Sequence, residues 1–141
     1  MVYEKYDTVV LWHLMEYVSP AGNPAITDWR NDLPTAARKA DCDAFLKLHV
    51  TVKDWVFPQF RALSGKDLRG FYELRWKSDG IPHRIGGYLS GRPNEFVMLI
   101  GFTHNQKKYD PPSTFETMIK RKKLILGGEA SLNEFEVVAG K

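Results

Sequence analysis

The sequence of 141 residues contains one cysteine, Cys42, and four histidines. A disulfide within the chain needs two cysteines, and a zinc site built from several cysteines needs more, so both are excluded. His13 and His49 have no spacing to each other or to carboxylates that is typical of a metal site. We therefore expect no metal and no small-molecule cofactor, and the lone cysteine favours a reducing, cytoplasmic location.

Long apolar runs are also absent. No stretch approaches the roughly 18 apolar residues of a membrane-spanning helix, and the segment MVYEKYDTVV is not followed by the apolar run and cleavage site of a signal peptide. No internal repeat or low-complexity tract is visible. The sequence thus predicts one domain over residues 1–126 without membrane association, followed by an acidic tail, 127–141, with the composition of a flexible segment.

Positive charge is concentrated in one part of the chain. Residues 1–60 carry six basic and eight acidic side chains, residues 61–126 carry thirteen and six, and residues 127–141 carry one and three. The overall charge of +3 therefore hides a central segment of +7. This asymmetry is typical of a surface that binds nucleic acid or another polyanion. For several of the lysines, the alternative is a solvated helix face.

Hydropathy and turn residues predict an α+β fold. The expected elements are, in order, a strand over Thr8–Val18, a helix from Pro24 to about Leu33, a helix from Thr35 to about Val52, two strands within Leu68–Leu89, a strand over Glu95–His104, and a helix from Ser113 to Leu126. We expect an antiparallel sheet of about four strands, with helices on one face and basic residues on the other. The aromatic tract around Trp55 and Phe57 is expected to be a packed connector.

The segment Leu68–Leu89 contains the clearest structural signal. Apolar and polar side chains alternate before Asp79-Gly80, a dipeptide typical of a two-residue type I′ hairpin turn. This turn sets three pairs opposite one another: Leu74 with Ile85, Arg75 with Arg84, and Trp76 with His83. Two arginines that face each other repel, so either an anion lies between them or Glu73, on the same expected wet face, neutralises Arg75.

The predicted strand over Glu95–His104 delivers further polar residues to the edge of the sheet. They are His104, Lys107, Lys108 and Tyr109. An imidazole titrates near pH 6.5 and suits general acid or base catalysis, but a strand-ending histidine bonded to backbone fits equally well. Tyr109 either stacks on a base or covers the edge of the core. Lys120 and Arg121, in the last helix, either contact RNA phosphates or solubilise the helix.

These motifs resemble those of the RelE/ParE/HigB superfamily of type II toxins, most closely the phage-derived HigB-like branch. The resemblance covers about residues 8–126 and rests on three blocks, namely Leu68-Arg-Gly-Phe-Tyr-Glu-Leu-Arg75, Asp79-Gly80 with Arg84, and Leu99-Ile-Gly-Phe-Thr103 before a lysine-rich loop and a basic helix. The family implies a RelE-like fold with the order strand-helix-helix-strand-strand-strand-helix. It also implies a small cytoplasmic toxin that cleaves mRNA in the ribosomal A site and is held inactive by an antitoxin, commonly a helix-turn-helix protein.

The resemblance also implies roles for individual residues. Arg84 matches the family's phosphate-stabilising arginine, and Arg75 matches a basic strand residue that grips the message. The family's lysine-rich loop implies a role in metal-independent catalysis for Lys107 and Lys108. His104 is a further catalytic candidate because of its imidazole, and the general base stays open among these three residues. We also assign Arg69, Lys77, Tyr109, Lys120 and Arg121 to RNA binding.

Two features depart from the family pattern. Thr103-His104-Asn105 separates the Gly-Phe pair from the lysines, and Glu73 stands where some ribosome-dependent members have lysine. Two functional classes therefore stay open. The first is a ribosome-dependent mRNA endoribonuclease. The second is a non-nucleolytic protein, either a ParE-like DNA gyrase inhibitor or a degenerate toxin that acts only as a protein-binding module.

Overall fold

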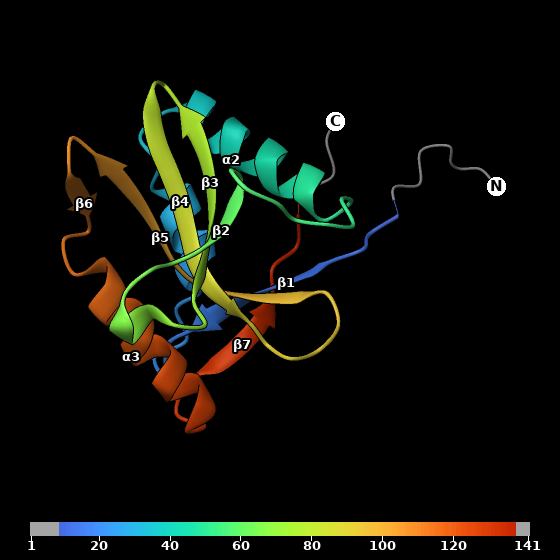
Figure 1. Cartoon of the computed structure of the whole chain (residues 1–141), viewed down its shortest axis with the longest axis vertical. Coiled ribbons are helices and arrows are strands. Elements are labelled where there is room, and N and C mark those ends of the chain that lie inside the picture. The colour runs from blue at the N-terminus through green and yellow to red at the C-terminus, as the bar shows by residue number, and fades with distance from the viewer. Residues whose placement is uncertain (1–8, 138–141) are drawn as a thin grey trace.

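The computed structural model describes residues 9–137, which form a seven-stranded sheet and three α-helices (Figure 1). The elements are β1 (His13–Val18), α1 (Ala25–Asn31), α2 (Ala36–His49), β2 (Phe60–Ala62), the 3-10 helix η1 (Lys66–Leu68), β3 (Tyr72–Ser78), β4 (Ile81–Leu89), β5 (Glu95–Asn105), β6 (Lys108–Asp110), α3 (Thr114–Leu126) and β7 (Ser131–Glu134). The strand order is β2-β3-β4-β5-β1-β7, and β6 pairs with β5. The predicted α+β class is confirmed.

The sheet has more strands than predicted, and one pair is parallel. The four expected strands are present as β1, β3, β4 and β5, with β1 beginning at His13 and Thr8 lying outside the described residues. β1 runs parallel to β5 because α1 and α2 carry the chain to the far edge, from which β2, β3, β4 and β5 return. The strands β2, β6 and β7 have three or four residues each, too few to show an alternating pattern.

Residues after 126 also contribute to the sheet. β7 pairs antiparallel with β1, with Leu132 opposite Tyr17. Phe135 and Val137 then pack against the hydrophobic core. The segment that was expected to be an acidic tail therefore includes an edge strand, while residues 138–141 lie outside the described part of the chain.

Helices cover both faces of the sheet (Figure 1). A side chain added at Gly101 of β5 would meet the Trp29 ring of α1, whereas one added at Gly86 of β4 would meet the Met118 sulfur of α3. Gly86 lies opposite Ile100, the neighbour of Gly101, so the two glycines point to opposite faces. The expectation that all helices share one face is therefore wrong. The face with α3 also carries the basic residues.

The predicted register of the β3–β4 hairpin is confirmed. Asp79 and Gly80 have φ angles of 54° and 73°, as a type I′ turn requires. Arg75 lies opposite Arg84. The Asp79 carboxylate accepts a 3.1 Å hydrogen bond from Nε of Arg38, which fixes the turn against α2. Among the described residues, no helix is long and apolar enough to cross a bilayer.

Candidate functional site

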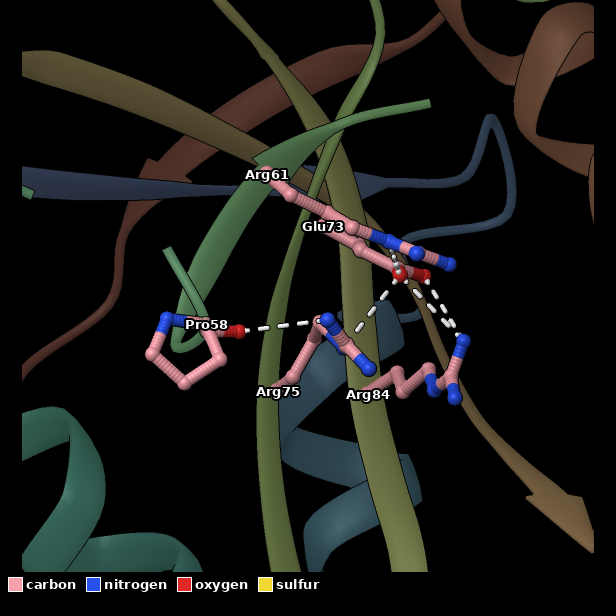
Figure 2. A network of polar contacts seen from close by, with 5 residues as sticks. All are labelled: Pro58, Arg61, Glu73, Arg75 and Arg84. Carbon is pink, nitrogen blue, oxygen red and sulfur yellow. Dashed lines mark hydrogen bonds and ion pairs between the residues drawn. The ribbon is translucent and has the colours of Figure 1, made fainter. Parts of the chain in front are cut away.

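Glu73 on β3 is a fully buried carboxylate surrounded by three arginines (Figure 2). Its Oε2 atom accepts a 2.6 Å hydrogen bond from Nε of Arg61 on β2 and a 3.2 Å hydrogen bond from Nη1 of Arg84 on β4. Nε of Arg75 lies 3.6 Å from the same oxygen. We call these four residues the arginine cluster. The expectation that Glu73 lies on a wet face is wrong, because it is enclosed within this cluster.

The sheet register brings the arginine cluster together. Arg61 lies opposite Glu73 across β2 and β3, and Arg75 lies opposite Arg84 across β3 and β4. Paired residues, and residues two apart on one strand, point to the same face. The sequence reasoning missed Arg61 because β2 has only three residues. The ion pair between Glu73 and Arg75, which is one of the two predicted arrangements, is present. The Glu73 carboxylate also pairs with Arg61 and Arg84, so it faces three cations.

The arginine cluster keeps an excess of positive charge. The pKa of Arg75 is lowered by burial and by repulsion from Arg61 and Arg84, and Glu73 offsets only part of this effect. Arg84 is 8% exposed, and within the described chain its buried Nε has no hydrogen-bond partner. A buried donor without an acceptor is unfavourable, so the hydrogen-bonding capacity of the Arg84 guanidinium is not fully used within the described residues.

A cavity of about 430 Å³ opens beside the arginine cluster. Its lining consists of Pro58, Gln59, Arg75, Trp76, Lys77, Pro82 and Arg84. The volume is in the range of small-molecule sites, and two guanidinium groups and an ammonium group on its wall favour an anion. Lys77 thus lies beside Arg75, as the hairpin register predicts, and its contact with RNA stays a prediction. A second cavity of about 190 Å³ contains Arg30, which is already paired with Asp43.

His104 near the end of β5 lies on the same sheet face as Arg84. Its ring stacks on Tyr109 of β6, with the centroids 4.1 Å apart and the planes 4° from parallel. Burial lowers the pKa of His104, as does the positive charge of Arg84 and Arg61, and Glu73 opposes this shift in part. The imidazole is therefore mainly neutral near pH 7, which is the form that accepts a proton.

The two predicted catalytic lysines have other positions. Gln106 and Lys107 have positive φ angles and form the turn of a hairpin between β5 and β6, in place of the expected loop. Lys108 lies opposite Asn105, so its side chain points to the face away from His104. Both lysines are exposed. Of the three candidates for the general base, His104 is the one that the strand register places on the face of the arginine cluster.

The Arg121 side chain makes contacts within the protein and is not free to bind a partner. Its Nη1 donates a 2.7 Å hydrogen bond to the carbonyl of Leu99, and its guanidinium lies 4.9 Å from the centroid of the Tyr17 ring. Leu99 has no partner on β4 because the sheet has a β-bulge there. Arg69, after η1, and Lys120, on α3, are exposed. The structure therefore does not bring these three predicted RNA contacts into the arginine cluster.

Other reactive side chains are less suited to catalysis. Cys42 is buried in α2, and burial raises the pKa of its thiol to about 12, so it is not a ready nucleophile. Within residues 9–137, no group of three or more His, Cys, Asp or Glu side chains is arranged to hold a metal ion. Comparison of the chain with protein-family models, with curated proteins and with solved structures finds no match.

Proposed function

We propose that the protein is the toxin of a type II toxin-antitoxin system and acts as a ribosome-dependent, metal-independent mRNA endoribonuclease. The observation that carries this proposal is a mainly neutral imidazole, His104, on the same sheet face as the arginine cluster. Cleavage of RNA by its own 2′-hydroxyl needs a base and cations that stabilise the phosphate. The resemblance of the hairpin motif to RelE/ParE/HigB toxins supports the same assignment.

The proposed reaction uses one residue as base and two as electrostatic catalysts. His104 accepts the proton of the ribose 2′-hydroxyl, and the 2′-oxygen attacks the neighbouring phosphorus. The bond from phosphorus to the 5′-oxygen breaks, and the leaving oxygen takes a proton from water. The hydroxide that remains takes the proton from the His104 imidazolium, which restores water and the neutral base. Arg75 and Arg84 stabilise the negative charge that develops on the phosphoryl oxygens. The products are a 2′,3′-cyclic phosphate and a 5′-hydroxyl end.

Glu73 acts as a positioning residue in this scheme. A guanidinium group has five N–H donors, so an arginine that contacts Glu73 with one edge keeps other donors for a phosphate. For Arg84, Nη1 is bonded to Glu73, and the residue also lines the cavity beside the arginine cluster. The carboxylate holds the arginines close together without neutralising all of them.

The proposal includes two kinds of macromolecular partner. The first is the ribosome with its bound mRNA, which would supply the positioning that a small cationic surface lacks. The second is a cognate antitoxin, and the family resemblance favours a helix-turn-helix protein. The excess positive charge of the arginine cluster is complementary both to RNA and to an acidic inhibitor.

Expression in bacterial cells with mapping of transcript ends tests the proposal. The wild-type protein is expected to arrest growth and to create mRNA fragments with 5′-hydroxyl ends. Arg84→Ala is expected to reduce cleavage by about 100-fold or more, because it removes a cation from the transition state. Arg92→Ala, an exposed arginine in the β4–β5 loop, is the matched control and should retain full cleavage.

Two outcomes would contradict the nuclease. Intact transcripts in cells that accumulate folded wild-type protein would exclude mRNA cleavage. DNA breaks or an SOS response with intact mRNA would instead identify an inhibitor of DNA gyrase.

A further inference from the structure

We infer that Phe57 is a stacking platform for a nucleobase, so that the arginine cluster binds single-stranded RNA through a base as well as through phosphate groups. The inference rests on the proposed function, because it places the RNA substrate relative to the arginine cluster. It assigns a binding role to the connector, which we define as residues 50–59 between α2 and β2.

The connector directs its aromatic side chains to two different sides. Trp55 packs inward, where Nε1 donates a 2.9 Å hydrogen bond to the His49 carbonyl and the ring stacks on Trp12 with centroids 4.0 Å apart. Phe57 is instead 69% exposed, and its neighbour Val56 is 62% exposed. The prediction of a packed connector is therefore wrong for these two residues. Single exposed apolar side chains are common, so the position of Phe57 has to decide its role.

Phe57 lies directly beside the cations of the candidate site. The guanidinium carbon of Arg75 is 5.8 Å from the centroid of the Phe57 ring. Nη1 of Arg75 also donates a 3.4 Å hydrogen bond to the carbonyl of Pro58, as Figure 2 shows. Pro58 and Gln59 line the cavity that contains Arg75 and Arg84. The connector thus forms a wall of the anion-binding cavity, and its exposed ring adjoins that wall.

A phenyl ring between a cation and solvent is suited to stacking on a base. Arg75 occupies one side of the ring through a cation–π contact, and the high exposure of Phe57 leaves ring surface open to solvent. Base stacking on an aromatic side chain changes affinity on the order of 5- to 150-fold per base. Bases in a duplex are already stacked on each other, so this contact favours a single strand.

The combination of cations and one exposed aromatic ring beside each other favours RNA over a protein as the occupant of Phe57. A nucleotide presents a phosphate and an aromatic base close together, and this surface presents guanidinium groups and an aromatic ring close together. A protein partner that used the exposed apolar surface would be expected to contact Val56 as well, because that side chain is exposed to a similar degree. A base stacked on Phe57 can bind without contacting Val56.

Binding of two probes by the full chain tests the inference. Fluorescence anisotropy would compare a short single-stranded oligouridine with an oligomer that has the same number of phosphates and no bases. The wild-type protein is expected to bind the oligouridine more tightly. Phe57→Ala should weaken oligouridine binding by about 5- to 150-fold and leave binding of the base-free oligomer unchanged. Phe57→Trp should retain the affinity, and Val56→Ala is the matched control that should change neither.

Equal affinity of the wild-type protein for both probes would overturn the inference, as would oligouridine binding that Phe57→Ala does not weaken. An equal loss in Phe57→Ala and Val56→Ala would indicate general apolar contact and would also overturn it. Because Phe57 is exposed, the thermal unfolding midpoint of each variant should match the wild type.

The assay contains no ribosome and no cleavage step. A protein that binds oligouridine through Phe57 but leaves cellular mRNA intact would therefore refute the proposed nuclease and keep this inference. Conversely, a protein that cleaves mRNA but binds both probes equally would refute only the inference.

Discussion

Glu73 holds together three arginines that would otherwise repel one another. Removing one partner from a buried ion pair typically costs about 3–5 kcal/mol, because the remaining charge has no counter-ion. The same carboxylate acts on His104, whose pKa it raises, while Arg84 and Arg61 lower that pKa in addition to the effect of burial. The protonation state of the proposed base is therefore set by the balance of charge in the arginine cluster.

Arg61→Gln is expected to raise the pKa of His104, because it removes a positive charge that disfavours the imidazolium. Arg61 is the suitable member of the arginine cluster because its side chain is 41% exposed and Glu73 keeps Arg84 and Arg75 as partners. An NMR titration of the His104 ring measures the change. If His104 is the base, the acid limb of the rate profile should move to higher pH with it.

Arg92→Gln is the control for a general change in protein charge and should leave the titration of His104 unchanged. A pKa of His104 that stays constant or falls in Arg61→Gln would contradict the electrostatic coupling. A shift of the titration without a shift of the rate profile would remove His104 from the role of general base.

Among the elements, the shortest ones determine which side chains reach the site. β2 supplies Arg61, the connector supplies Phe57, and the β5–β6 hairpin stacks Tyr109 on His104. These segments are too short or too irregular to show hydrophobic periodicity, so the sequence could not place them. The β3–β4 hairpin was predictable because Asp79-Gly80 specifies its turn type, and the turn type fixes the register of every following pair.

The direction and burial of a side chain depend on turn length and on pairing between distant segments. The family's lysine-rich loop predicts that Lys108 acts beside His104, but a two-residue turn directs Lys108 to the opposite face. Glu73 was expected on a wet face because it alternates with apolar residues, but alternation cannot show that three arginines from three strands cover it. In the β3–β4 hairpin, the local pattern thus predicts which residues share a face, and long-range pairing decides their burial.

Helix α1 depends on a side chain from a distant element. Its N-cap residue, Pro24, makes no capping hydrogen bond, and Glu16 of β1 takes this role instead. Glu16 accepts hydrogen bonds of 2.9 Å and 2.8 Å from the backbone N–H groups of Ile26 and Thr27. Glu16→Ala is therefore expected to lower the free energy of unfolding by about 2–4 kcal/mol, because buried donors lose their acceptor. Urea denaturation measures the loss.

Glu95→Ala is the matched control for Glu16→Ala, since Glu95 also lies on a strand but accepts a hydrogen bond from Ser90 in exposed surroundings. It should cost at most about 1 kcal/mol. Faster amide hydrogen exchange in α1 should accompany the effect of Glu16→Ala. Equal losses in the two variants would show that the capping contact contributes little to stability.

At the scale of the whole molecule, the net charge counted along the sequence is larger than the positive charge that is free to bind a partner. Part of the +7 segment is committed to the structure, because Arg121 bonds to the Leu99 carbonyl and Lys122 lies 4.6 Å from the centroid of the Tyr88 ring. α3 covers part of its sheet face, and on that face Arg61, Arg75, Lys77 and Arg84 gather in the arginine cluster and its cavity. The usable positive surface is therefore smaller and more sharply placed than the sequence count indicates.

The stability of the whole chain is expected to decrease on mild acidification. Burial is the largest factor that lowers the pKa values of His49, His83 and His104 in the folded protein. An unfolded histidine titrates near pH 6.5, so below that pH the unfolded chain binds more protons than the folded one. The free energy of unfolding should thus be highest above about pH 6.5 and fall as the pH decreases toward about 5.5.

Urea denaturation at about pH 7.5 and at about pH 5.5 measures this change while Asp and Glu side chains remain mainly ionised. His49→Gln should make the pH dependence shallower, because the amide can keep a hydrogen bond to the Phe45 carbonyl, which His49 Nδ1 contacts at 2.9 Å, without titrating. A stability that is constant or that increases on acidification would contradict the burial of these histidines in their neutral form. Since His104 is one of the three, the same protons that weaken the fold would also inactivate the proposed base, so activity and stability should decline over the same pH range.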